Sequence, residues 1–156
     1  MKERDKSSIE RVNGIVLNVF KLNGIFIKAA DCLTKGSELT SARWQILGTV
    51  LHEQHTVAAI ARSMGLARQS VQRIADVLVS EGLAEFLPNP AHRRAKLLSS
   101  TEKGLNTIKN IRPKVVAWAE AVNDLIGEEE LNGADNAITN LLSKLMLAEE
   151  QLIKRC

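Results

Sequence analysis

The sequence predicts a mainly α-helical protein with one small β-hairpin, and three observations support this fold class. Over most of the chain, apolar residues recur at steps of three and four, the spacing of helices with one buried face. Residues 83–99 instead hold two short β-type runs separated by Pro88-Asn89-Pro90, a turn that cannot be helical. The 156 residues are 45% hydrophobic and 25% charged, which is typical of a globular domain with a buried core.

The first predicted helix is unusually long and covers residues 9–33. Gly14 and Gly24 weaken it locally, and Gly36 ends it. The apolar residues that keep helical spacing along it are Ile9, Val12, Val16, Val19, Phe20, Phe26, Ile27, Ala30 and Leu33.

Two shorter helices are predicted next. One begins in Leu39-Thr40-Ser41, which offers an N-cap, and runs to about Glu53. The other begins after the N-cap Thr56 and stops at Gly65, where a left-handed C-cap is needed. Their apolar faces hold Trp44, Leu47 and Leu51 in the first, and Val57, Ile60, Ala61 and Met64 in the second.

A fourth helix, from about Arg68 to Ser80, follows the short connection Gly65-Leu66-Ala67. Two short helices joined in this way form the helix-turn-helix pattern, whose second helix can enter the major groove of duplex DNA. On this helix, polar residues that can contact bases or phosphates stand opposite the apolar set Val71, Ile74 and Leu78; they are Arg68, Gln69, Gln72 and Arg73, with Ser70 near the helix start. For this helix alone, an ordinary solvent-exposed polar face explains the pattern equally well.

The hairpin makes DNA binding the better interpretation. Strands are predicted at Leu83 to Leu87 and at Ala95 to Ser99, and a hairpin placed directly after a helix-turn-helix is a wing. Its tip carries His92, Arg93, Arg94 and Lys96. An arginine at a narrow tip can reach into a minor groove while its neighbours hold phosphates. The alternative is an ordinary charged loop.

Two further helices complete the chain. The first starts at Ser100 or Thr101 and continues to about Gly127, with a kink expected at Pro113. The last starts at about Glu128 and has its weak point at Gly133. The expected fold is thus mainly α with a small β-hairpin wing, a winged helix-turn-helix core between long N- and C-terminal helices.

The segments LTSARWQILGTVL and VAAIARSMGLARQSVQRIADVLVSEGLAEFLPNPAHRRAKLLSSTEKG resemble the winged helix-turn-helix core of MarR-type transcriptional regulators. The resemblance runs from about Leu39 to Gly104, and the flanking helices have the order and length of that family. It implies a single domain over residues 1–156, with a DNA-binding core at 39–104 and dimerisation helices at 9–36 and 105–154.

The resemblance also implies a function. MarR-type regulators are homodimers that bind pseudo-palindromic double-stranded DNA, usually repress, and often release DNA when a small aromatic acid or phenolic effector binds. By position, it makes Arg68, Gln69, Ser70, Gln72 and Arg73 recognition-helix residues and puts Arg94 in the minor groove. The chain departs from the family where His92 replaces a common Asp, Ala67 a capping Ser or Thr, Ser100 an apolar residue and Val77 a frequent Arg.

Charge and composition narrow the function classes. Residues 61–96 carry a net charge of +3 and residues 128–156 a net charge of −3, which favours a duplex-binding module beside a scaffold that does not bind DNA. Aromatic residues make up only 3% and Tyr is absent, which argues against stacking single-stranded DNA or RNA. The main alternative is a winged-helix protein-protein interaction module. An enzyme is the least favoured class, since no nucleophile with a base, carboxylate pair or Gly-rich phosphate loop stands out.

No cofactor and no metal is predicted. His52 and His55 are spaced to share one helix face, but the sequence identifies no third ligand. Cys32 and Cys156 lack CxxC spacing, and Cys32 is expected to be a small buried residue. No signal peptide or membrane-spanning stretch is recognised, so a cytoplasmic protein is expected.

Overall fold

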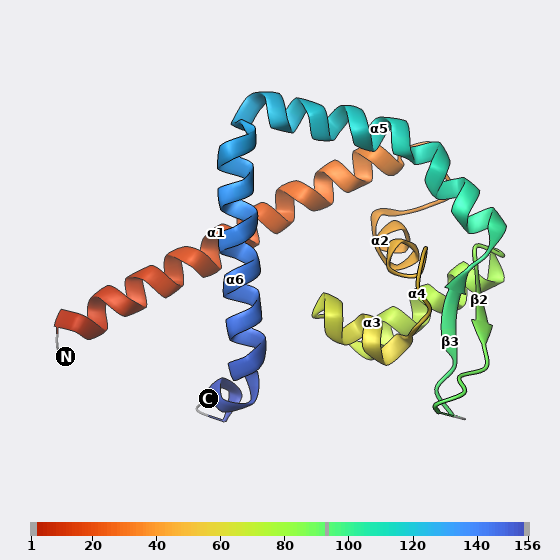
Figure 1. The fold of residues 1–156 in the computed structure, drawn as a ribbon, viewed down its shortest axis with the longest axis horizontal. Helices are drawn as coiled ribbons and strands as arrows, with labels where there is room; N and C mark the ends of the chain where they lie inside the picture. The colour runs from red at the N-terminus through yellow and green to blue at the C-terminus, as the bar shows by residue number, and fades with distance from the viewer. Residues whose placement is uncertain (1–2, 93, 155–156) are drawn as a thin grey trace. The chain divides into compact units, whose positions relative to one another are not determined.

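The computed structural model describes residues 3–92 and 94–154, so Arg93 and Cys156 lie outside the described residues. Within these ranges the elements follow in the order α1 (Glu3–Thr34), α2 (Ser41–Thr49), β1 (His55–Thr56), α3 (Val57–Met64), α4 (Arg68–Ser80), β2 (Ala84–Leu87), β3 (Leu97–Ser100), α5 (Glu102–Ile126) and α6 (Glu128–Ile153) (Figure 1). The mainly helical fold with a small antiparallel wing is confirmed. By its contacts the chain divides into two compact units, Met1–Arg112 and Pro113–Cys156.

The core of the first unit is built by the apolar faces of α2, α3 and α4 together with the sheet. Its fully buried side chains are Ile46, Leu47, Val50, Ile60, Val71, Leu78, Leu83 and Leu98. Fully burying one such aliphatic side chain stabilises a fold by about 1.5–3 kcal/mol. This core fixes the position of α4, the helix predicted to read DNA.

The helix boundaries follow from local chemistry. Thr40 and Thr56 cap α2 and α3, because their hydroxyls accept hydrogen bonds from the backbone N–H groups of Arg43 (3.3 Å) and Ala59 (3.1 Å). α2 ends at Thr49, earlier than the predicted Glu53. The reason is that the Val50 carbonyl accepts a hydrogen bond from the N–H of Ser100 at 3.2 Å instead of continuing the helix.

The wing belongs to a three-stranded antiparallel sheet with the strand order β1-β3-β2. β2 and β3 are the predicted hairpin, and Phe86 and His55 both lie opposite Leu98, one on each side of β3. The two-residue strand β1 was not predicted, since a run of two residues carries no periodicity. It ties the start of α3 directly to the wing.

The start of α5 is anchored to the chain between α4 and β2. The Thr101 hydroxyl donates to the Gly82 carbonyl (2.7 Å) and accepts from the N–H of Gly104 (3.1 Å). The Lys103 ammonium donates to the Glu81 carbonyl (2.9 Å), and Arg43 of α2 forms an ion pair with the Glu81 carboxylate. α5 then continues through Pro113 to Ile126.

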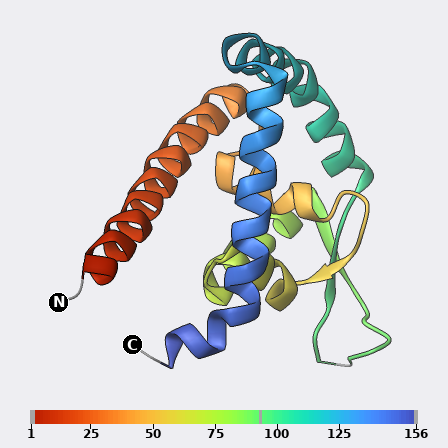
Figure 2. The same ribbon diagram turned by 60° about the vertical axis from the view of Figure 1, so that its left-hand side comes forward.

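The buried residues described in α1, Ala30, Leu33 and Thr34, lie at its C-terminal end. The rest of the helix extends beyond the other elements of its unit, as the red-to-orange ribbon shows in Figure 2. Before Ala30, the predicted apolar face is therefore exposed, with Phe20 68% and Val12 58% accessible. Cys32 was expected to be buried, but it is exposed beside the buried Leu33.

In the second unit, α6 also exposes large apolar side chains, among them Leu142, Leu145, Met146 and Leu147. Among the described residues, no helix combines the length and the apolar character that crossing a membrane requires.

Candidate nucleic-acid interface

The turn between α3 and α4 has the geometry of a Schellman C-cap. Gly65 adopts the left-handed conformation (φ 63°). Its N–H donates to the Arg62 carbonyl (3.3 Å), and the N–H of Leu66 donates to the Ala61 carbonyl (2.9 Å). A residue with a Cβ atom is strained in this conformation, so glycine lets α3 stop abruptly and α4 start three residues later.

α4 has one buried face and one exposed face, as its sequence predicts. Val71, Ala75 and Leu78 are buried in the core. The predicted recognition residues lie away from this core, because Gln72 is half-buried and the others are exposed: Arg68, Gln69, Ser70 and Arg73. Within the described part of the chain, the guanidinium groups of Arg68 and Arg73 enter no ion pair. Their charges are therefore available to a ligand.

The start of α4 lacks a side-chain cap. Ala67 occupies the N-cap position and makes no side-chain hydrogen bond. The first-turn N–H groups of a helix have no partner within the helix, and they attract anions. The N–H of Ser70 donates to the Ala67 carbonyl (3.0 Å). Among the hydrogen bonds of the described residues, the N–H groups of Arg68 and Gln69 are left to solvent or to a phosphate.

The tip of the wing is folded by Asn89. Its side-chain oxygen accepts from the N–H of Ala91 (3.0 Å), and its carbonyl accepts from the N–H of His92 (3.2 Å). His92, Arg94 and Lys96 are exposed, while the predicted contact residue Arg93 lies outside the described residues. No described carboxylate pairs with Arg94. The missing wing Asp is therefore not replaced by another acid.

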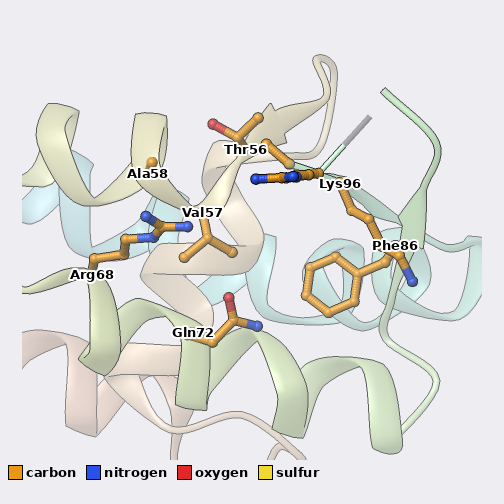
Figure 3. A pocket seen from close by; sticks show the side chains of 9 residues that line it. Thr56, Val57, Ala58, Arg68, Gln72, Phe86 and Lys96 are labelled. Atoms are coloured by element: carbon orange, nitrogen blue, oxygen red, sulfur yellow. The ribbon is translucent and has the colours of Figure 1, made fainter. Parts of the chain in front are cut away.

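A concave site of about 310 Å³ lies between α4 and the wing (Figure 3). Arg68 and Gln72 of α4 border it on one side, and Phe86 of β2 and Lys96 border it on the other. The residues that line it are Thr56, Val57, Ala58, Arg68, Gln72, Phe86, Arg94, Ala95 and Lys96. Three of these are cationic and none is acidic, so the site attracts anions. We call it the helix–wing groove.

Comparison with known proteins agrees with this geometry. A family model described as MarR family matches residues 37–95. The chain is 31% identical over 136 residues to the uncharacterised protein Rv2011c of Mycobacterium tuberculosis, a match that covers 87% of this chain and 95% of its relative. The chain belongs to the MarR family.

Solved MarR-family structures share the fold. A cysteine-to-serine mutant of MarR from E. coli in complex with operator DNA superposes with a TM-score of 0.74 at 17% identity, covering 85% of this chain and 96% of that one. CouR from Rhodococcus jostii RHA1, bound to p-coumaroyl-CoA, gives 0.71 at 20% identity and covers 81% and 90%. This MarR-family protein is a DNA-binding winged helix-turn-helix transcription regulator, and the family consists of regulators rather than enzymes.

The sequence prediction missed several residues at the candidate interface of this MarR-family chain. Thr56 and Phe86 line the helix–wing groove because β1 and β2 flank β3, a neighbourhood that a linear pattern does not reveal. Asp76 accepts a hydrogen bond from the Gln72 amide nitrogen (2.8 Å). Its signal was present in the sequence, since residues four apart on a helix are neighbours.

The histidines near α2 do not gather into a larger cluster. The His55 imidazole lies 3.7 Å from the Glu53 carboxylate, and His52 is exposed. Residues 3–92 and 94–154 contain no group of three or more His, Cys, Asp or Glu side chains placed to hold a metal ion.

Proposed function

We propose that this protein is a homodimeric, sequence-specific regulator that represses transcription by binding a pseudo-palindromic DNA duplex, and that a small aromatic or phenolic effector relieves the repression. The observation that carries the proposal is the helix–wing groove, with its three cationic residues Arg68, Arg94 and Lys96 and no acidic residue among those that line it.

The groove fits the backbone of one DNA strand. A helix in the major groove and a wing in the adjacent minor groove must straddle the sugar-phosphate chain that separates the two grooves. Arg68 and Lys96 then neutralise phosphates from either side, with Ser70, His92 and Arg93 as further phosphate contacts. Arg94 enters the minor groove, where the negative potential favours a guanidinium.

Base reading falls to the outer face of α4. In the major groove, adenine presents a hydrogen-bond donor beside an acceptor, and guanine presents two acceptors. Gln69 and Gln72 carry amides that match adenine, and Arg73 carries a guanidinium that matches guanine. Phosphate contacts position the protein, whereas these side chains provide sequence preference.

A second copy of the chain is the partner that the exposed apolar faces of α1 and α6 require. Contiguous exposed apolar surface in a monomer marks an interaction site, and α1 exposes Val12, Phe20 and Ile25 by more than half. Two copies also match DNA recognition, since two α4 helices about 34 Å apart enter successive major grooves on one side of the duplex.

The effector acts in this proposal by changing the spacing of the two α4 helices. A ligand that binds the two arrangements of the dimer unequally shifts their populations, and hence the DNA affinity. The related CouR structure, which contains p-coumaroyl-CoA, supports an aromatic acid or phenolic chemistry for the ligand class.

Fluorescence anisotropy tests the proposal. The purified protein is titrated against the duplex upstream of its own coding region and against a scrambled duplex, each at two salt concentrations. A specific regulator prefers the upstream duplex by about a thousandfold or more. Its affinity falls linearly in a log-log plot against salt, with a slope set by the number of phosphate contacts. Equal and weak binding to every duplex, including a genomic fragment library, would reject the proposal in favour of a protein-protein interaction module.

A further inference from the structure

An acidic residue, Asp76, lies close to the basic residues of α4. Asp76 is exposed on α4, one helical turn after Gln72 and three residues after Arg73. A carboxylate at this place is repelled by the phosphates that the neighbouring arginines attract. If α4 binds DNA as proposed, repulsion by Asp76 opposes binding to every sequence, which raises the question of what Asp76 contributes.

The contact that Asp76 makes is with Gln72. The amide nitrogen Nε2 of Gln72 donates to Oδ1 of Asp76 at 2.8 Å. An ionised carboxylate can accept hydrogen bonds but cannot donate them. Of the two ends of the Gln72 amide, only the nitrogen can face Asp76, so chemistry determines which way the amide is turned.

This orientation has a consequence for base reading. A Gln amide without such a partner can turn both of its N–H groups toward the two acceptors of guanine, O6 and N7. With one N–H committed to Asp76, the amide offers one N–H and the oxygen Oε1. That pair matches adenine, which presents the N7 acceptor beside the N6 donor.

We propose that Asp76 is a positioning residue that makes Gln72 selective for adenine over guanine, by holding the Gln72 amide with Oε1 available to the DNA. The inference rests on the proposed function, because it requires that α4 reads bases. It adds a residue that acts through Gln72 without itself contacting a base.

The test compares base preference among variants of the full-length protein. Duplexes selected from a randomised pool by the wild-type protein are resynthesised with each single-base change, and affinities are measured by anisotropy for wild type, Asp76→Ala, Asp76→Asn, Gln72→Ala and the double variant Gln72→Ala/Asp76→Ala. Thermal unfolding confirms that each variant is folded. Gln72→Ala identifies the base pair that Gln72 reads, since only there does the preference disappear.

At that base pair, wild type is expected to favour adenine over guanine by about tenfold or more. Asp76→Ala reduces this ratio severalfold and leaves the ratios at other positions unchanged. Asp76→Asn removes the same charge but keeps an acceptor oxygen, so its ratio lies between those of wild type and Asp76→Ala. Both variants bind all duplexes more tightly, because a negative charge is gone from the interface.

Two results would overturn the inference while leaving the proposed function intact. One is an unchanged adenine preference in Asp76→Ala. The other is an Asp76→Ala effect on base preference of the same size in the Gln72→Ala background, which would mean that Asp76 acts without Gln72. Failure of the wild-type protein to select any sequence from the pool would instead overturn the proposed function, and the inference with it.

Discussion

Gly104 and Leu83 are in such close contact that no larger residue fits at position 104. A Cβ atom added to Gly104 would lie 2.1 Å from the carbonyl oxygen of Leu83 and 3.3 Å from Cδ1 of Leu47. The same carbonyl accepts a hydrogen bond from the N–H of Thr101 at 3.1 Å. The first turn of α5 is thus seated directly on the backbone that leads into the wing.

Replacing Gly104 by alanine is therefore expected to destabilise the protein. The methyl group can be accommodated only if the backbone of α5 or of Leu83 moves, and overpacking of this kind costs about 1–3 kcal/mol. The free energy of unfolding, measured by urea denaturation, should fall by this amount.

Gly48 of α2 provides the matched control. Nothing lies within 4 Å of a Cβ atom at Gly48. Gly48→Ala should raise the free energy of unfolding by about 0.5–1 kcal/mol, since alanine favours a helix interior over glycine. Effects of the same sign at both positions would contradict the contact described for Gly104.

The uncapped start of α4 predicts a stabilising substitution. Ala67→Ser introduces a hydroxyl at an N-cap whose backbone is already extended (φ −65°, ψ 131°), and should add about 1 kcal/mol to the free energy of unfolding. Thr56→Ala, at the N-cap of α3, should remove a similar amount because the bond to Ala59 is lost. Unchanged thermal and urea unfolding in Ala67→Ser would mean that the introduced hydroxyl accepts no hydrogen bond from the first turn of α4.

The wing arginine should affect affinity and its salt dependence together. Arg94→Ala is expected to weaken binding to all duplexes. It should also lower the log-log salt slope by about one, because one fewer positive charge then displaces counterions from the DNA. Lys109→Ala removes the same charge from an exposed position on α5 outside the helix–wing groove. A salt slope that fell equally in both variants would show only an effect of net charge.

A charge placed on the apolar face of α1 is expected to prevent dimerisation. Phe20→Asp places a carboxylate where we propose that the second copy packs, so sedimentation velocity should show a monomer. The monomer should bind the upstream duplex far more weakly than wild type, since each half-site is then bound separately. Asn18→Asp adds the same charge at a polar position of α1 and should remain dimeric. Loss of the dimer in both variants would mean that a negative charge anywhere on α1, and not specifically on its apolar face, prevents dimerisation.

The local parts of the fold were predictable because their causes are local. The bounds of α3 follow from the Thr56 cap and the left-handed Gly65, and those of α4 from the apolar repeat of Val71, Ala75 and Leu78. Thr56 and Gly65 act through their own backbone neighbours, so a linear sequence contains the information. The predicted recognition residues are exposed or half-buried for the same reason, since none of them occupies a buried position of this repeat.

The elements that escaped prediction depend on segments far apart in the sequence. α2 ends early because Val50 bonds to Ser100, and β1 exists only as a neighbour of β3. Phe86 lines the helix–wing groove because β2 lies beside the same strand. The sequence of residues 50–56 alone does not predict these pairings, because the residues that they pair with belong to the wing.

The sheet separates the part of the wing that supports the fold from the tip, which we propose contacts DNA. β3 is paired on both sides, by β1 and by β2, whereas the described tip residues 88–92 and 94–96 lie outside the strands. Replacing a side chain at the tip therefore leaves the ladder and the buried Leu98 intact. In a duplicated copy of such a chain, changes at the tip that alter DNA affinity can accumulate one substitution at a time, without compensating changes in the core.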